Sequence, residues 1–143
     1  MNDSLFQGGC LCGAVRYEIA APLPAGEYCH CSMCRKAHAS AFSANIVVPT
    51  AALSVTAGAD LVTEYASSAN RSKCFCARCG SHLFIRRSGD AHSTVVTLGS
   101  LDDDAAIPPP QRHVFVDSKA PWHVVAAALP QYRIYPGYEP VKD

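Results

Sequence analysis

Apolar and polar residues alternate along short stretches of this chain, and turn-forming residues separate the stretches. In "AVRYEIA" (14–20), Val15, Tyr17 and Ile19 alternate with charged residues, and a period of two is typical of a half-buried strand. Regular short strands divided by turns indicate a mostly β fold of antiparallel strands. The pattern predicts strands over 14–20, 42–48, 61–66, 82–86 and 93–99.

Helical patterning is confined to one or two short segments. The stretch "SMCRKAHAS" (32–40) predicts a short helix with Ser32 as its N-cap. A second helical turn is expected within "PWHVVAAAL" (121–129), although the β-branched Val124 and Val125 weaken that interpretation. The proline triplet at 108–110 predicts an extended loop.

Length and charge restrict the class of protein. A chain of 143 residues is most simply a single domain, 1–143, that can bury a sizeable core. Twelve basic and twelve acidic residues balance, so no overall field favours nucleic acid or an anionic membrane. The start of the chain has no secretory signal pattern, and no apolar run approaches the roughly 20 residues that span a bilayer. We expect a cytoplasmic protein with no nucleic-acid or membrane partner.

The eight cysteines are gathered in "CLC" (10–12), "CHCSMC" (29–34) and "CFCARC" (74–79). In a reducing cytosol, thiols at such short offsets are more often metal ligands than disulfides. Their pairwise spacing suits tetrahedral zinc better than an iron–sulfur cluster, which stays the lesser alternative.

Two cysteine pairs predict a closed structural zinc site. "CARCG" supplies Cys76 and Cys79 as a CxxC turn, and "GGCLCG" supplies Cys10 and Cys12 between glycines. Four thiolates from two segments complete a tetrahedral site of the structural kind.

The segment "CHCSMC" offers three more thiols, Cys29, Cys31 and Cys34, to one ion. Three protein ligands leave a fourth position for water or substrate, which is the mark of a catalytic zinc. Cys74 either completes this second site, which would make both sites structural, or is a small buried hydrophobe. Further fourth-ligand candidates, none of them assigned, are His30, His38 and His82.

In their order, the blocks "GGCLCGAVRY", "CHCSMCRK", "FCARCGSHLF" and "SKAPWH...LPQY" resemble the glutathione-dependent formaldehyde-activating enzyme family, also called S-(hydroxymethyl)glutathione synthase-like proteins. The resemblance implies the zinc-binding β-tent fold and two zinc ions per chain. It implies a structural zinc on Cys10, Cys12, Cys76 and Cys79, and a catalytic zinc on Cys29, Cys31 and Cys34. The implied activity is addition of glutathione to formaldehyde, classed as a carbon–sulfur lyase for the reverse direction.

An open zinc position predicts a specific chemistry. A thiol that coordinates zinc loses its proton below neutral pH, and the zinc-bound thiolate can attack formaldehyde or another small aldehyde. A small-molecule thiol and an aldehyde are thus the expected partners; a non-catalytic two-zinc binding or structural module is the alternative. Trp122 is a candidate for a pocket wall or a core anchor. Donors for the carboxylates of glutathione would come from Arg35, Lys36, Arg112 and Lys119.

Overall fold

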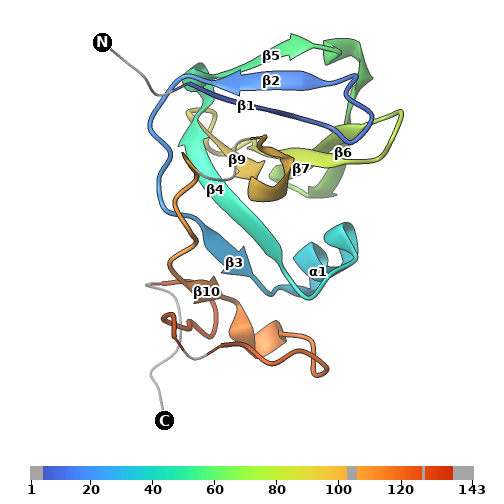
Figure 1. Ribbon diagram of the computed structural model, residues 1–143. Helices are drawn as coiled ribbons and strands as arrows, with labels where there is room; N and C mark the ends of the chain where they lie inside the picture. Colours follow the sequence, from blue (N-terminus) through green and yellow to red (C-terminus); the bar gives the residue numbers. More distant parts are fainter. Residues whose placement is uncertain (1–4, 103–105, 127, 137–143) are drawn as a thin grey trace. The chain divides into compact units, whose positions relative to one another are not determined.

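The computed structural model describes residues 5–102, 106–126 and 128–136 (Figure 1). The chain divides into two compact units, each made of two separate stretches. The first unit comprises Met1–Pro24 and Ile46–Pro108, and the second comprises Ala25–Asn45 and Pro109–Asp143. That residues 1–143 act as one domain stays a prediction.

The first unit contains a three-stranded antiparallel sheet in the order β1-β2-β5 (Figure 1). In the central strand, Tyr17 and Ile19 are buried while the alternating charged residues Arg16 and Glu18 are half-exposed, so the predicted alternation is confirmed. The strands are β1 (Phe6–Gly9), β2 (Arg16–Ile19) and β5 (Leu53–Ala57), and the 3-10 turns η1 (Thr50–Ala52) and η2 (Ala59–Leu61) flank β5.

An antiparallel series of strands in the order β9-β8-β7-β6 forms the rest of this unit's sheet structure, with β4 beside β9. Four consecutive residues of β9, from Thr94 to Thr97, are buried, as expected of a strand covered on both faces. The bounds are β4 (Ser43–Pro49), β6 (Val62–Ser68), β7 (Arg71–Cys76), β8 (His82–Arg87) and β9 (Ser93–Thr97), followed by η3 (Leu98–Ser100).

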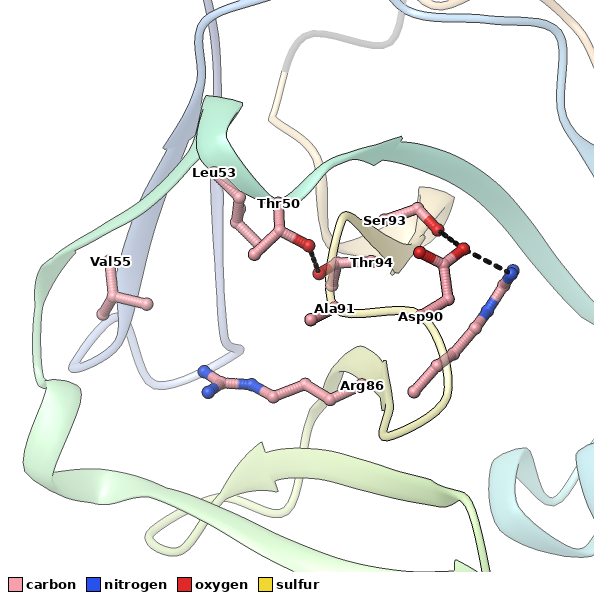
Figure 2. A pocket seen from close by; sticks show the side chains of 9 residues that line it. Thr50, Leu53, Val55, Arg86, Asp90, Ala91, Ser93 and Thr94 are labelled. Carbon is pink, nitrogen blue, oxygen red and sulfur yellow. Dashed lines mark hydrogen bonds and ion pairs between the residues drawn. The ribbon is translucent and has the colours of Figure 1, made fainter.

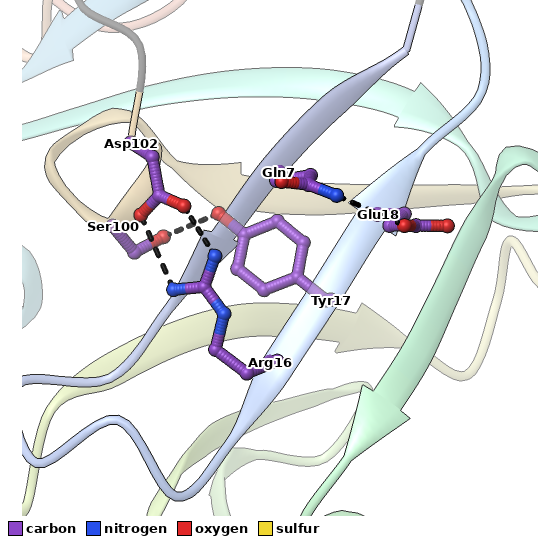
Figure 3. Close-up of polar contacts among 6 residues, drawn as sticks. All are labelled: Gln7, Arg16, Tyr17, Glu18, Ser100 and Asp102. Atoms are coloured by element: carbon purple, nitrogen blue, oxygen red, sulfur yellow. Dashed lines mark hydrogen bonds and ion pairs between the residues drawn. The ribbon is translucent and has the colours of Figure 1, made fainter.

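The core of the first unit is organised around Tyr17. Its ring packs edge-on against Phe84, with centroids 5.1 Å apart and planes at 76°. Its hydroxyl lies 2.6 Å from the Ser100 hydroxyl (Figure 3). A Cβ on Gly8 would lie 2.4 Å from the Tyr17 ring, so only glycine fits there. Beside this contact, Arg16 and Asp102 form an ion pair (Figure 3).

The second unit joins three short strands and the one α-helix among the described residues. Strand β3 (Glu27–Cys29) pairs antiparallel with the start of β4 and parallel with β10 (His113–Val114). Helix α1 (Ser32–His38) follows β3, and the 3-10 turn η5 (Val116–Ser118) follows β10. These elements agree with the mostly β fold of antiparallel strands that the sequence predicts.

Two local predictions are wrong. The N-cap of α1 is Cys31, not Ser32, because the sulfur of Cys31 accepts the backbone N–H of Cys34. No helix forms over the described part of 121–129; instead, the Lys119 ammonium donates to the carbonyls of Ala120 and His123, holding an irregular loop. Residues 108–110 form a loop, as predicted. Within the described ranges, no helix has the length and apolar character needed to cross a membrane.

Candidate metal centres

The thiols of Cys10, Cys12, Cys76 and Cys79 converge in the first unit. All four sulfurs lie within 4.8 Å of one another, with 3.5 Å between those of Cys10 and Cys12 and 4.0 Å between those of Cys12 and Cys76. A tetrahedral zinc with Zn–S bonds of about 2.3 Å separates its sulfurs by about 3.8 Å. The donor set therefore fits one zinc-sized ion.

Two tight turns present these thiols. The turn after β1 is closed by the Gly13 N–H on the Cys10 carbonyl, and the turn after β7 by the Gly80 N–H on the Cys76 carbonyl. Both glycines have positive φ, 79° and 80°, which L side chains adopt with strain. The resulting curl aims backbone N–H groups at sulfur, as when Val15 donates to Cys10 at 3.2 Å. Such donors stabilise thiolates.

Ser81 connects the two turns. Its hydroxyl accepts the N–H of Leu11 at 2.9 Å and lies 3.3 Å from the Cys79 sulfur. The hydrogen bond from Ser81 is the main cause that lowers the pKa of Cys79 to about 5. Nothing in the residue spacing identifies this serine in advance.

Cys29, Cys31 and Cys34 form the second cluster, in the second unit. Their sulfurs also lie within 4.8 Å of one another. Cys29 ends β3, Cys31 caps α1, and Cys34 lies in the first turn of that helix. Cys29 and Cys34 are buried, whereas Cys31 is partly exposed. Sequence spacing thus predicted both groups of cysteines that the fold brings together.

The three thiols of this cluster differ in the direction of their pKa shifts. Hydrogen bonds from the thiols of Cys29 and Cys34 lower the pKa of Cys31 to about 2, and the N–H groups of Cys34 and Met33 add to this. The same interaction with Cys31 raises the pKa of Cys29. Three thiols this close together can serve as ligands of one cation once they lose their protons.

An apolar wall surrounds the second cluster. Val114 is fully buried against Cys29 and Cys34, and Phe115, Tyr132 and Tyr135 pack on the same group. The wall comes from residues about 80 or more positions further along the chain. Only Tyr132 lies in a block that the sequence analysis singled out.

The other thiol and imidazole candidates lie outside both groups. Cys74 is fully buried in β7, and burial raises its pKa. Among the residues that the structure describes, neither metal-sized group includes Cys74, His30, His38 or His82. This placement supports the interpretation of Cys74 as a small buried hydrophobe.

The four basic candidates differ in their partners. Arg112 is held by Glu27 through two hydrogen bonds, of 2.9 and 2.7 Å, and also donates to the Tyr135 hydroxyl. The Lys119 ammonium donates hydrogen bonds to two backbone carbonyls. Lys36 is exposed, whereas Arg35 is half-buried and its buried Nε has no hydrogen-bond partner. Trp122 is 71% exposed, so it is not a core anchor.

A pocket of the first unit contains no thiol. Its hydroxyls and charges pair with one another: Thr50 with Thr94 at 2.8 Å, and Ser93 with Asp90 at 2.6 Å (Figure 2). Arg87 lies near Asp90, and Arg86 extends toward Val55. The thiols that could bind a metal therefore lie outside this pocket, in the two cysteine clusters.

The chain is mostly β and gathers seven cysteines into two groups, each of which could hold one metal ion. Residues 5–118 match the model of the family described as "Glutathione-dependent formaldehyde-activating enzyme", and the chain belongs to that family.

Relatives and a solved structure agree with this assignment. A Halomonas elongata protein named as a glutathione-dependent formaldehyde-activating enzyme is 29% identical over 94% of this chain and 88% of its own length. A Talaromyces marneffei protein of the same name is 32% identical over 79% of this chain and 64% of its own. A crystal structure of a Rhodobacter sphaeroides protein matches with a TM-score of 0.58 and 24% identity, covering 73% of this chain and 99% of that one. The structural match shows a shared fold. The matched region spans about two thirds of the Talaromyces protein.

Proposed function

We propose that each chain binds two zinc ions. One is a structural ion on Cys10, Cys12, Cys76 and Cys79, and the other a catalytic ion on Cys29, Cys31 and Cys34. The observation that carries the proposal is the difference between the two groups. Four sulfurs fill a tetrahedral zinc, whereas three sulfurs without a fourth Cys, His, Asp or Glu ligand among the described residues leave one position for an incoming ligand.

The proposed reaction joins a thiol, glutathione in the family's name, to formaldehyde or another small aldehyde. The thiol sulfur forms a bond to the carbonyl carbon, the C=O π bond breaks, and the proton given up by the thiol ends on the new hydroxyl. The product is a hemithioacetal, and the enzyme class is carbon–sulfur lyase, named for the reverse direction. Bound zinc would supply the positive charge that lets a thiol ionise near neutral pH.

The chain's own residues would shape the surroundings of that reaction. Cys29 and Cys34 are buried against Val114, so water reaches the cluster mainly from the side of Cys31. An apolar wall strengthens electrostatic interactions within the site because it excludes water. Tyr132 and Tyr135 would bound the space available to the aldehyde.

Arg35 is the best-placed donor for a substrate carboxylate. It lies four residues after Cys31, and its backbone N–H donates to the Cys31 carbonyl at 3.0 Å. Residues four apart share one face of a helix, and helical side chains lean toward the N-terminus, which here is Cys31. A half-buried guanidinium with an unpaired Nε can form the fork that binds a carboxylate.

The second candidate function is a non-catalytic two-zinc module. It is favoured by the burial of Cys29 and Cys34, which is more usual for a structural site.

Metal content and exchange NMR distinguish the two functions. For the enzyme, we expect about two zinc ions per chain, of which mild chelation removes one while the fold persists. The loaded protein should accelerate exchange between free glutathione and its formaldehyde adduct above the uncatalysed rate, and protein with one ion should not. Two ions lost together with unfolding, and no acceleration, would favour the module.

A further inference from the structure

His30 separates two of the proposed zinc ligands and faces away from them. Cys29 ends β3, and Cys31 has extended backbone with φ −65° and ψ 153°. Successive side chains of an extended chain point to opposite sides. The neighbours agree: Cys29 and Cys31 pack with Val114 and its aromatic companions, whereas the His30 ring lies beside Phe42, His113 and His123.

The His30 side chain is fully buried and tied to another element. Its Nε2 lies 2.9 Å from Nδ1 of His113, and the ring centroids are 5.1 Å apart. Phe42 packs on the same ring at 5.5 Å. A buried hydrogen bond between two rings fixes both orientations more tightly than apolar packing alone.

Strand β10 repeats the same alternation. Val114 pairs with Cys29 and lies in the cysteine cluster, while the adjacent His113 turns to the other side and meets His30. The backbone N–H of His30 also donates to the Val114 carbonyl at 3.0 Å. The hydrogen bond between the His30 and His113 side chains therefore joins β3 to β10 at the residue that lies between Cys29 and Cys31.

We propose that His30 and His113 are a positioning pair that fixes the Cys29 and Cys31 thiols in the arrangement one metal ion needs. Neither ring belongs to the metal-sized group, so the pair acts through the backbone that it holds. The inference rests on the proposed metal site of the second cluster. Replacing residues that orient metal ligands typically lowers metal affinity about 10–100-fold, and we expect a loss of that size.

The test separates the hydrogen bond from ring packing. His113→Phe keeps a ring and removes the bond, whereas His113→Asn keeps a polar atom near the position of Nδ1. Full-length protein is chelated mildly until one ion per chain remains, then titrated with Co²⁺, and the absorption of the thiolate-bound metal is followed. We expect His113→Phe to weaken Co²⁺ binding about 10–100-fold and to alter the shape of the absorption band. In His113→Asn, most of the Co²⁺ affinity and of the wild-type band shape should be retained. His92→Ala, an exposed histidine of the first unit, is the control that should change neither.

Each result decides something different. Equal Co²⁺ affinity and spectrum in wild type and His113→Phe would overturn the positioning role while leaving the metal site intact. A wild-type protein that takes up no second ion would overturn the proposed metal site itself. Should His113→Phe fail to fold, His113→Asn is compared with His113→Gln, whose amide lies one bond further out. Equal affinity of those two would also overturn the proposal.

Discussion

The sulfur of Cys31 accepts a hydrogen bond from the backbone N–H of Cys34 at 3.3 Å, so one proposed zinc ligand caps the helix that carries another. Hydrogen bonds from the thiols of Cys29 and Cys34 also lower the pKa of Cys31 to about 2. Helix capping and ligand geometry are therefore coupled at this residue.

Two substitutions separate these roles. Cys31→Ser should lose the second ion and thiol-dependent activity but keep the cap, because a serine hydroxyl accepts the same N–H. Cys31→Ala should lose both, and its free energy of unfolding should be about 1 kcal/mol lower than that of Cys31→Ser. Chemical denaturation of both variants, each with one ion per chain, measures the difference. Equal stability would show that the cap contributes nothing.

Replacing Cys76 should have a larger effect. In the proposed site, this fully buried cysteine would bind one ion together with Cys10 and Cys12, which are far away in the sequence. The binding energy of that ion would then also be folding energy for the first unit. We expect Cys76→Ser to be insoluble or unfolded by circular dichroism, while Cys31→Ser stays folded. Comparable structural damage from both changes would mean that both ions are structural.

Cys74→Ala tests the remaining thiol. The Cys74 sulfur is buried and belongs to neither cysteine group, so its removal should leave two ions per chain. The free energy of unfolding should fall by about 1–2 kcal/mol, the cost of a small cavity. Elemental analysis and denaturation give both quantities. A chain with one ion fewer would make Cys74 a ligand.

Arg35→Gln tests carboxylate recognition. A charge-assisted hydrogen bond contributes about 1.5–3 kcal/mol, so the KM for mercaptoacetate should rise about 10–100-fold. The KM for 2-mercaptoethanol, a thiol without a carboxylate, should stay the same. The adjacent exposed lysine provides the matched control, Lys36→Gln, which should affect neither thiol. A parallel rise for both thiols would indicate damage to the cluster instead.

The ion pair of Arg16 and Asp102 makes stability depend on pH. The hydrogen bond from Arg16 holds the pKa of Asp102 below its usual range. Because the pKa of Asp102 is lower in the folded state, the ion pair stabilises the protein at pH values above the unfolded pKa of about 3.9. This stabilisation is lost as the pH falls through the folded-state pKa. With side chains 36% and 47% exposed, the pair should contribute less than about 1 kcal/mol. Chemical denaturation should therefore find Asp102→Asn slightly less stable than wild type at pH 7, and this difference should begin to shrink as the pH falls toward about 4. Asp60→Asn, at an exposed site, is the control, and a difference that persists in acid would contradict the assignment.

Local patterns predicted the features that depend on neighbouring residues. Alternation identified β2, and spacing identified both cysteine groups, because a short turn brings such thiols together wherever it lies in the fold. Strand β7 escaped detection since Arg71 and Lys73 interrupt its apolar pattern, and two-residue β10 is too short to carry one. The second helix was expected over a segment that Lys119 holds as a loop.

The wall of the second cluster was not predictable for a different reason. Phe115 and Tyr135 pack on the group that contains Cys29 and Val114, and the parallel pairing of β10 with β3 brings these two residues together from distant stretches of chain. The hydrogen bond between His30 and His113 depends on the same pairing. One sequence without its relatives carries no signal of such long-range partners.

The division of each unit into two stretches sets an order of assembly during synthesis. Chains emerge from the ribosome N-terminus first, and units fold as their parts become available. Cys10, Cys12, Cys76 and Cys79 are all present once residue 79 has emerged, but the second cluster lacks β10 and its aromatic wall until residues 113–135 have emerged. We therefore expect a nascent chain to bind the proposed structural ion first, and the thiols of the second cluster to stay exposed to solvent until residues 113–135 have been synthesised.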